Sequence, residues 1–264
     1  MKITQNIEIV DLALCFGSTL VIADLHIGYE EALNRQGFLV PRTQFEEIVK
    51  RIENIFNILK GKKLKNIIIN GDLKQEFGMI SEQEWRNALK FLDLLAKHCD
   101  EVILVKGNHD TMLKPIANKR NVKVLDYLII DSMEKHNNKK IPILKKMLKN
   151  TQKSKNQKIL IIHGDKIPSK ELMKGISTIV IGHEHPAVSI KEGARIEQFK
   201  CFLKGKYNGK TLIVQPSFNT LIEGTNILRD NIHSPFLKQD LDNFEVFAVE
   251  DKVYDFGKLK KLRN

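Results

Sequence analysis

Short runs of apolar, often β-branched residues alternate along the chain with longer stretches whose apolar positions recur every three or four residues. The short runs are typical of strands buried on both faces, and the longer stretches are typical of amphipathic helices. The runs that predict strands are residues 19–23, 66–69, 102–105, 159–162 and 178–181. Their alternation with helical segments predicts an α/β fold.

Two helices carry start signals as well as the correct period. Thr43 and Glu46 have capping-box spacing ahead of apolar residues that continue to Leu59, just before Gly61. Ser81 and Glu84 repeat this spacing ahead of a second apolar face. Because the second helix lies between the runs at 66–69 and 102–105, it predicts a right-handed βαβ unit with parallel strands.

The pattern changes after about residue 196, where alternating strands and turn signals predict antiparallel pairs. Asn208-Gly209 is a hairpin signal, and Asp251-Lys252 lies between two further strand-like runs. There is no internal repeat and no linker rich in proline, glycine or serine. We therefore expect one domain over residues 1–264.

Charge is concentrated in one segment of this predicted domain. The chain has 43 Lys and Arg against 32 Asp and Glu, a net charge of +11. Residues 135–158 hold nine of the lysines and no acid, so we interpret them as a lysine-rich insertion. The remaining 34 basic and 32 acidic residues nearly cancel. The insertion can attract DNA or RNA, or form a solvated loop, and it has no aromatic residue for base stacking.

Several classes of protein are disfavoured by composition. The three cysteines, Cys15, Cys99 and Cys201, are odd in number and lack metal-type spacing, so we expect free thiols. The longest uncharged apolar run, 12–23, is shorter than the roughly 20 residues that cross a bilayer. Acidic Glu8 and Asp11 precede it, which disfavours a secretory signal. We expect a cytoplasmic protein with no membrane partner.

Each of the five predicted strands is followed by side chains that bind metals or transfer protons. The segments are Asp24-Leu25-His26, Gly71-Asp72, Gly107-Asn108-His109-Asp110, His163-Gly164-Asp165 and Gly182-His183-Glu184-His185. They contain five of the eight histidines. Loops at the carboxyl ends of strands in an open α/β sheet converge on one crevice, so we expect a single site.

The spacing within these segments indicates which side chains share a side. In extended backbone, residues i and i+2 project together, so Asp24 and His26 form one pair, and His183 and His185 another with Glu184 pointing away. Carboxylate, imidazole and amide donors suit transition metals. Seven candidate ligands exceed one tetrahedral ion and fit two ions about 3.5–4 Å apart, with Asp72 as the candidate bridge.

The motifs D-x-H, G-D, G-N-H-D, H and G-H-x-H occur in order over residues 24–185, and with them the chain resembles the calcineurin-like metallophosphoesterase superfamily. The stretch DLHIGYEEALNRQGFLVPRTQ resembles archaeal phosphoesterases related to the nuclease subunit SbcD. The resemblance implies a four-layer αββα sandwich with mixed sheets.

The same resemblance implies roles for the motif residues. One ion would be held by Asp24, His26, Asp72 and His185, and the other by Asp72, Asn108, His163 and His183. A hydroxide activated by the ions would attack phosphorus in line, while His109 assists the leaving oxygen and Asp110 orients its imidazole. The expected cofactors are two divalent transition-metal ions, manganese first, with iron, zinc and nickel as alternatives.

Three residues near the motifs have open roles. Gln75 stands where near relatives often carry histidine, so a substrate-side imidazole is missing there. Lys74 is expected either to contact phosphate or to form a surface ion pair. Asp165 is expected either to steady His163 or to cap the following turn, with the first role favoured.

These observations predict a metal-dependent phosphoesterase that hydrolyses phosphodiesters, with nuclease activity among its functions. A small-molecule phosphomonoesterase or a cyclic-nucleotide phosphodiesterase would use the same centre. The non-enzymatic alternative is a metal-stabilised nucleic-acid-binding module, which would not require His109 beside the ligands.

Overall fold

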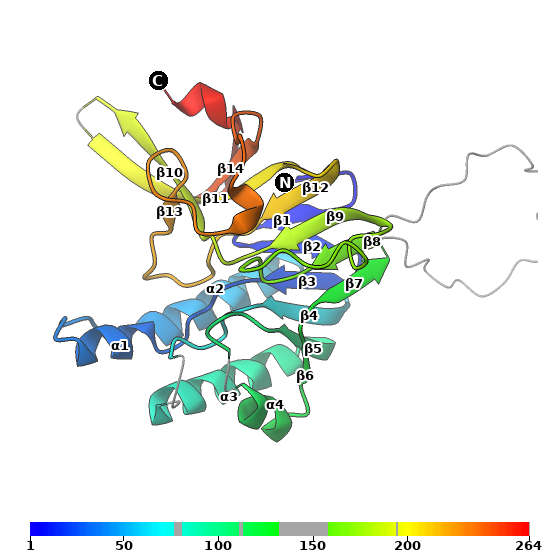
Figure 1. Ribbon diagram of the computed structural model, residues 1–264. Helices are drawn as coiled ribbons and strands as arrows, with labels where there is room; N and C mark the ends of the chain where they lie inside the picture. The colour runs from blue at the N-terminus through cyan, green and yellow to red at the C-terminus, as the bar shows by residue number, and fades with distance from the viewer. Residues whose placement is uncertain (77–80, 111–112, 132–157, 194, 264) are drawn as a thin grey trace, which may run out of the picture.

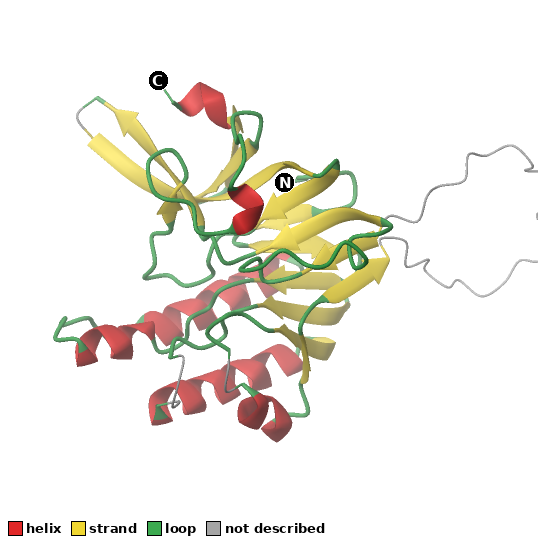
Figure 2. Ribbon diagram, in the orientation of Figure 1, coloured by secondary structure: helices red, strands yellow, loops and turns green. Residues whose placement is uncertain are grey.

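A computed structural model describes residues 1–76, 81–110, 113–131, 158–193 and 195–263. Two β-sheets pack face to face, and the α-helices lie against the outer side of the first sheet (Figures 1 and 2). Of the predicted lysine-rich insertion at 135–158, all but Lys158 lies outside the described residues.

The first sheet has six strands in chain order, β1-β2-β3-β4-β5-β6. Strands β3 to β6 pair in parallel, and β1 to β3 are antiparallel. Their bounds are β1 Glu8–Val10, β2 Ala13–Phe16, β3 Thr19–Ile22, β4 Leu64–Asn70, β5 Cys99–Val105 and β6 Lys123–Leu125. The predicted parallel pair around the second helix is thus confirmed as β4 and β5.

Four helices of the described residues lie against this sheet, and the second and third present to it the apolar faces that the sequence predicts. They are α1 Tyr29–Arg35, α2 Gln44–Ile58, α3 Glu82–Ala96 and α4 Lys114–Lys119. At the start of α3, Ser81 and Glu84 form a complete capping box. The box predicted for α2 is wrong, because Thr43 makes no side-chain cap hydrogen bond and its hydroxyl donates to the Glu47 carboxylate, 3.1 Å away.

The second sheet has nine strands, ordered β13-β10-β11-β12-β9-β8-β7, with β14 on β11 and β15 on β14. Strands β8, β9 and β12 pair in parallel. The bounds are β7 Leu128–Asp131, β8 Lys158–Ile161, β9 Ile176–Ile181, β10 Pro186–Glu192, β11 Arg195–Tyr207, β12 Lys210–Val214, β13 Thr225–Asn226, β14 Glu245–Val249 and β15 Val253–Lys258.

Both predicted hairpins are present in this sheet. Strands β11 and β12 are joined by Asn208 and Gly209, whose φ angles of 48° and 75° are those that a type I′ turn requires. Strands β14 and β15 are antiparallel on either side of Asp251-Lys252.

Alternate residues of the second sheet enter different cores, so the sheet is buried on both faces. Ile159 and Ile161 of β8 pack toward the first sheet, whereas Leu160 packs into a second cluster on the other side. That cluster contains Phe236 and Leu237 of the short 3-10 helix η1 (Pro235–Leu237). The layers agree with the expected αββα sandwich, although in the described residues η1 and loops cover this outer face instead of a long helix.

Two further expectations concern thiols and membranes. Cys15, Cys99 and Cys201 are all free, as predicted. Among the helices that the structure describes, none combines the length and apolar character needed to cross a bilayer.

Candidate metal centre

The five polar segments lie at the carboxyl ends of five strands, three in the first sheet and two in the second. Asp24 and His26 follow β3, Asp72 follows β4, and Asn108 to Asp110 follow β5. His163 follows β8, and the two histidines at 183 and 185 follow β9. The predicted convergence is present: side chains from both sheets meet within ion-pair distances of one another.

Two buried carboxylates form the middle of this cluster. Each has one oxygen fixed by a main-chain amide, because His183 N donates to Asp24 Oδ2 at 3.0 Å and His109 N donates to Asp72 Oδ1 at 2.9 Å. The other oxygens face imidazoles. Asp72 Oδ2 lies 3.8 Å from His26 Nε2 and 3.4 Å from His163 Nε2. Asp72 therefore lies between two groups of histidines.

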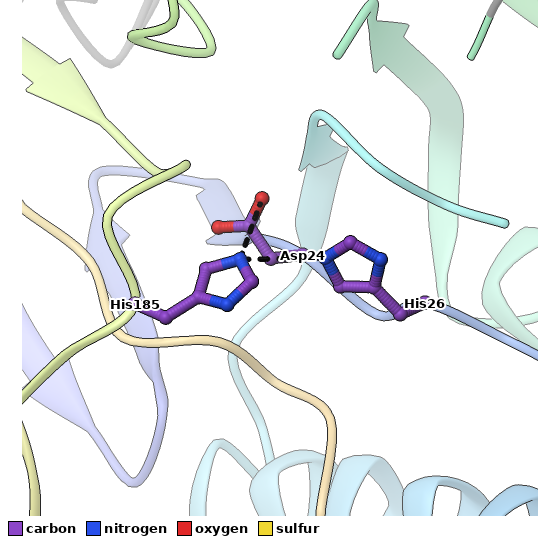
Figure 3. A group of neighbouring side chains, drawn as sticks. All are labelled: Asp24, His26 and His185. Atoms are coloured by element: carbon purple, nitrogen blue, oxygen red, sulfur yellow. Dashed lines mark hydrogen bonds and ion pairs between the residues drawn. The ribbon is translucent and has the colours of Figure 1, made fainter. Parts of the chain in front are cut away.

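The imidazoles approach one another in pairs through their nitrogens. His26 Nε2 and His185 Nε2 are 3.3 Å apart beside Asp24 (Figure 3), and His183 Nδ1 and His163 Nε2 are 3.2 Å apart. Two nitrogens bound to one ion at about 2.1 Å, at angles between 90° and 110°, are themselves about 3.0–3.4 Å apart. Asn108 Oδ1 lies 2.9 Å from His163 Nε2.

Three groups of side chains have ligand atoms within 4.8 Å of one another: Asp24-His26-His185, Asp72-His163-His183 and His26-Asp72-His109. The first two reproduce the division between two ions that the resemblance implies. The third includes His109, which the resemblance leaves unligated.

Backbone conformation at the site differs from the one assumed for the sequence. Asp24, His26, Asp72, His183 and His185 all have positive φ angles, between 46° and 65°. Asp24 and His26 do lie together, whereas His183 and His185 reach the centre in two different groups of ligand atoms. Extended backbone is the wrong reason for either pair, since left-handed residues make the chain turn sharply at each ligand. A left-handed non-glycine residue costs about 1–3 kcal/mol and persists where the surroundings enforce it.

Two glycines allow the close approach of these turns. A Cβ atom added to Gly71 would overlap the His163 ring, and one added to Gly107 would overlap the Asp72 carboxylate. Gly71 also has a φ of 87°, which only glycine adopts readily. Larger residues at these positions would displace a candidate ligand.

The charges of the cluster are strongly coupled. Burial lowers the pKa of His26 to about 3, with the nearby His185 acting in the same direction, so this imidazole is neutral and able to bind a metal. Burial also opposes a charge on His163, but contact with Asp72 and the charge of Asp24 outweigh it and raise the pKa to about 9. A cation bound there would replace that proton.

The donor set fits divalent cations. Asp24 Oδ1 is buried and accepts no hydrogen bond from the described residues, although His185 Nε2 lies 3.5 Å away and His163 Nδ1 lies 3.6 Å away. An unsatisfied buried carboxylate oxygen is costly unless a cation or proton approaches it. The imidazoles around Asp24 are too close together for all of them to be protonated. A bound cation could supply the positive charge that Asp24 Oδ1 lacks.

His109 is oriented by a main-chain carbonyl. Its Nδ1 lies 2.6 Å from Gln75 O, and its ring meets the His26 ring edge-on at 4.9 Å. Asp110, which the resemblance assigns to this task, instead accepts the amides of Leu73 and Gly107 at 3.2 and 3.0 Å. Burial and the charge of Asp72 raise the pKa of Asp110 to about 6.

The residues with open roles are placed as follows. Lys74 fits neither expectation, because its side chain is buried and its Nζ donates to the carbonyls of Glu76 and His109. Asp165 pairs with Lys166 at 3.6 Å. Glu184 points away from the centre, as predicted, and accepts the amides of His233 and Ser234.

Several residues that shape the centre carried no sequence signal. Buried Gln44 donates to His26 O at 2.9 Å, and Ser217 Oγ donates to Asp24 O at 2.8 Å. Glu84 was predicted only as part of a cap, yet its carboxylate also accepts the amides of Gln75 and Glu76. Each of these contacts uses a main-chain atom. Because every residue has the same main-chain atoms, the sequence does not show which of them will form such a contact.

Comparisons with known proteins concern the family and the fold of the chain. Residues 17–197 match a family model described as "Calcineurin-like phosphoesterase". No curated protein matches the chain. Among solved structures, the nuclease MPE of Pseudomonas putida has 14% identity and a TM-score of 0.57, with 94% of this chain and 93% of that chain covered. This likeness concerns the fold.

Two other solved structures are more distant. AQ665 of Aquifex aeolicus, a protein of unknown function, has 19% identity and a TM-score of 0.37 over 63% of this chain and 78% of that one. The phosphoesterase YfcE of E. coli has 14% identity and a TM-score of 0.40 over 93% of this chain and 99% of that one.

Proposed function

The chain belongs to the calcineurin-like phosphoesterase family, and on that premise we propose that it is a dinuclear metal-dependent phosphodiesterase acting on nucleic acid. The observation that carries the proposal is the position of Asp72 between two groups of imidazoles, with His109 beside them. Metal ligation by Asp24, His26, Asp72, Asn108, His163, His183 and His185 is part of it.

The residues present fit two divalent ions, with manganese as the first candidate and iron, zinc and nickel as alternatives. Two such ions lower the pKa of a shared water and neutralise charge on phosphoryl oxygens. Asp24, His26 and His185 would hold the first, His163, His183 and Asn108 the second, and Asp72 both.

His109 supplies the proton chemistry in this proposal. Because the Gln75 carbonyl can only accept, His109 Nδ1 carries the hydrogen of that contact, and Nε2 is the atom that exchanges a proton. Nε2 would donate to the leaving oxygen. The Asp110 carboxylate holds the loop before His109 through Gly107 N and so acts on the ring's position through the main chain.

Two observations favour a diester over a monoester. Lys74, the cation nearest in sequence to Asp72, directs its ammonium group at two main-chain carbonyls, so its charge is not offered to a second phosphate oxygen. The protein whose fold is similar over 94% of this chain, MPE of Pseudomonas putida, is a nuclease.

The test is a panel of substrates with manganese added: bis-p-nitrophenyl phosphate, p-nitrophenyl phosphate, cyclic nucleotides, and single- and double-stranded DNA. We expect cleavage of the synthetic diester and of DNA, loss of both in Asp72→Asn, and no loss in Asp126→Asn, a surface residue paired with Lys106. Activity restricted to monoesters or cyclic nucleotides would overturn the substrate class. DNA binding without turnover would favour the binding-module alternative.

A further inference from the structure

A groove lined by basic side chains lies beside strand β10, away from the metal ligands. Its volume is about 590 Å³. The basic residues come from three segments: Lys191 from β10, Arg229 from the loop after β13, and Lys261 and Arg263 from the 3-10 helix η2 (Leu259–Leu262) and its end. The other described lining residues are Ser189, Ile190, Leu228 and Leu262, so none is acidic. We call this hollow, with its four charged residues Lys191, Arg229, Lys261 and Arg263, the basic groove.

The nearby acids leave most of this charge uncompensated. The Asp230 carboxylate accepts Asn226 N at 2.7 Å, and Asp242 pairs with Arg263 at 3.0 Å. A larger hollow of about 860 Å³ differs in this respect, because its Arg51 is paired with Asp11 at 3.0 Å and glutamates line it as well. Only the basic groove, of the two, presents a net positive surface.

The basic groove is connected to the metal centre by a single strand. Strand β10 begins at Pro186, directly after His185, and Lys191 is six residues beyond that histidine. At about 3.3 Å per residue this is about 20 Å. Strand β13 pairs with the start of β10. In Figure 1, β10 runs outward into the hairpin that it forms with β11, and the C-terminal helix η2, in red, lies at the same end of the molecule.

We propose that the basic groove binds backbone phosphates of the nucleic-acid strand whose scissile diester lies at the metal centre. This inference rests on the proposed function. A separation of about 20 Å corresponds to about six base pairs of B-form duplex at 3.4 Å each. Arginine's planar fork matches phosphate oxygens, and two of the four residues are arginines.

A repeated phosphate backbone fits the groove better than an acidic polypeptide does. The positive charges are spread over three separate segments beside a strand that leads to the candidate phosphoesterase centre, so one polyanion can occupy both places. An acidic peptide contains no phosphodiester, so binding it in the groove would not be linked to the chemistry of the metal centre. The substrate is therefore expected to extend at least from the centre to Lys191.

The test compares two quadruple variants. The first replaces Lys191, Arg229, Lys261 and Arg263 with glutamine. The matched control replaces four exposed lysines on the helical side of the molecule, Lys60, Lys63, Lys90 and Lys97, with glutamine. Both are assayed for kcat/KM at several salt concentrations with bis-p-nitrophenyl phosphate, a thymidine dinucleotide, and a 24-base-pair duplex with its separated strand.

We expect the groove variant to cleave the two small diesters like the wild type. For duplex DNA, the slope of log(kcat/KM) against log salt should become shallower by about 3.6, since each of the four lost phosphate contacts contributes about 0.9. For the control variant, DNA cleavage should stay close to wild type.

Equal effects of the two variants on DNA, with small diesters still cleaved, would overturn the groove proposal and leave the proposed function intact. A wild type that cleaves small diesters but neither binds nor cleaves DNA would overturn both the groove and the nucleic-acid substrate. Groove-dependent binding of poly-glutamate that DNA fails to displace would reassign the surface to an acidic protein.

Discussion

Five of the seven candidate ligands hold a left-handed backbone that their side chains disfavour. In the part of the chain that the structure describes, eight non-glycine residues have positive φ, and only Asp11, Asn121 and Asn208 lie outside this set. Strain is thus concentrated at the carboxylates and imidazoles of the centre. Asp and His adopt the left-handed region more readily than most other non-glycine residues, and a contact between the two sheets, His183 N to Asp24 Oδ2, helps to hold it.

At the residue scale, His109→Ala tests whether His109 is a proton donor or a ligand. We expect kcat for bis-p-nitrophenyl phosphate to fall about 10²–10⁴-fold, the usual contribution of general acid catalysis, while two metals remain bound. His98→Ala, a histidine stacked on Phe56, serves as the control. Because ligand atoms of His109, His26 and Asp72 lie within 4.8 Å of one another, the metal content of the variant distinguishes a proton donor from a ligand. A loss of metal as large as in His26→Ala would make it a ligand.

The glycines provide a second prediction at this scale. Gly71 and Gly61 both have a φ of 87°, but an added Cβ meets the His163 ring only at Gly71 and open space at Gly61. Both Ala variants should lose about 1–2 kcal/mol of unfolding free energy from backbone strain. Gly71→Ala should in addition lose tight manganese binding, measured by titration calorimetry. Equal manganese affinity in the two variants would contradict the packing of Gly71 against His163.

At the element scale, strand β11 supports the loop that holds Asp24. The ammonium group of Lys200 donates to the carbonyls of Ser217 and Asn219, and Ser217 in turn bonds the main chain of Asp24. Burial, followed by the charge of Arg51, lowers the pKa of Lys200 to about 7. Keeping the Lys200 ammonium group charged in the interior below about pH 7 therefore lowers the free energy of unfolding.

This lowered pKa predicts a pH-dependent stability. The unfolded lysine keeps its proton up to about pH 10.4, whereas the folded one releases it above about pH 7. Between these values the unfolded state binds more protons, so the Lys200 contribution to unfolding free energy rises with pH. In urea titrations at pH 6.5 and 9, the stability of the wild type relative to Lys200→Met should increase by about 2–3 kcal/mol.

Lys204→Met is the control for this experiment, because Lys204 lies on the same strand and pairs with Glu245 at 2.7 Å. An equal pH-dependent difference in this variant would show that the effect does not come from Lys200.

At the scale of the whole molecule, the candidate ligands join the two sheets. Asp24, His26, Asp72 and Asn108 come from the first sheet, and His163, His183 and His185 from the second. Bound ions would therefore stabilise the packing of one sheet on the other, since the unfolded chain does not hold the ligands together.

Manganese at 100 times its dissociation constant should stabilise the fold by about 2.7 kcal/mol for one site. For a chain of this length we expect a rise in Tm of about 5–10 °C, reversible with a chelator. Asp72→Asn should remove most of the rise, because Asp72 faces both groups of imidazoles. Thermal scans of the two proteins with and without manganese provide the measurement, and the same rise in both would exclude Asp72 as a shared ligand.

The fold and the candidate centre could be predicted to different depths. The five apolar runs became β3, β4, β5, β8 and β9, because a continuous apolar run and its β-branched residues are local properties that can be recognised without knowing the fold. Strand polarity predicted that polar segments at the ends of parallel strands converge, but their meeting across two sheets depends on how the sheets pack. The covering of the second sheet by η1 depends on packing and lay beyond any local pattern. The Thr43 hydroxyl had a second local partner in Glu47, four residues on, and it bonds that exposed carboxylate instead of forming a cap.

By itself, the sequence determined which strands form and which donor atoms follow them, since each is written in a few consecutive residues. Only the tertiary structure decided that Gln75 holds the His109 ring, that Lys74 is buried, and that Lys191 lines one groove with Arg229 and Arg263. These relations join main-chain atoms, or residues far apart in the chain. A main-chain carbonyl is chemically the same in every residue, so the sequence does not mark the one that holds the His109 ring. The charges of the groove lie far apart in the chain and gather only when β10, the loop after β13 and η2 fold together.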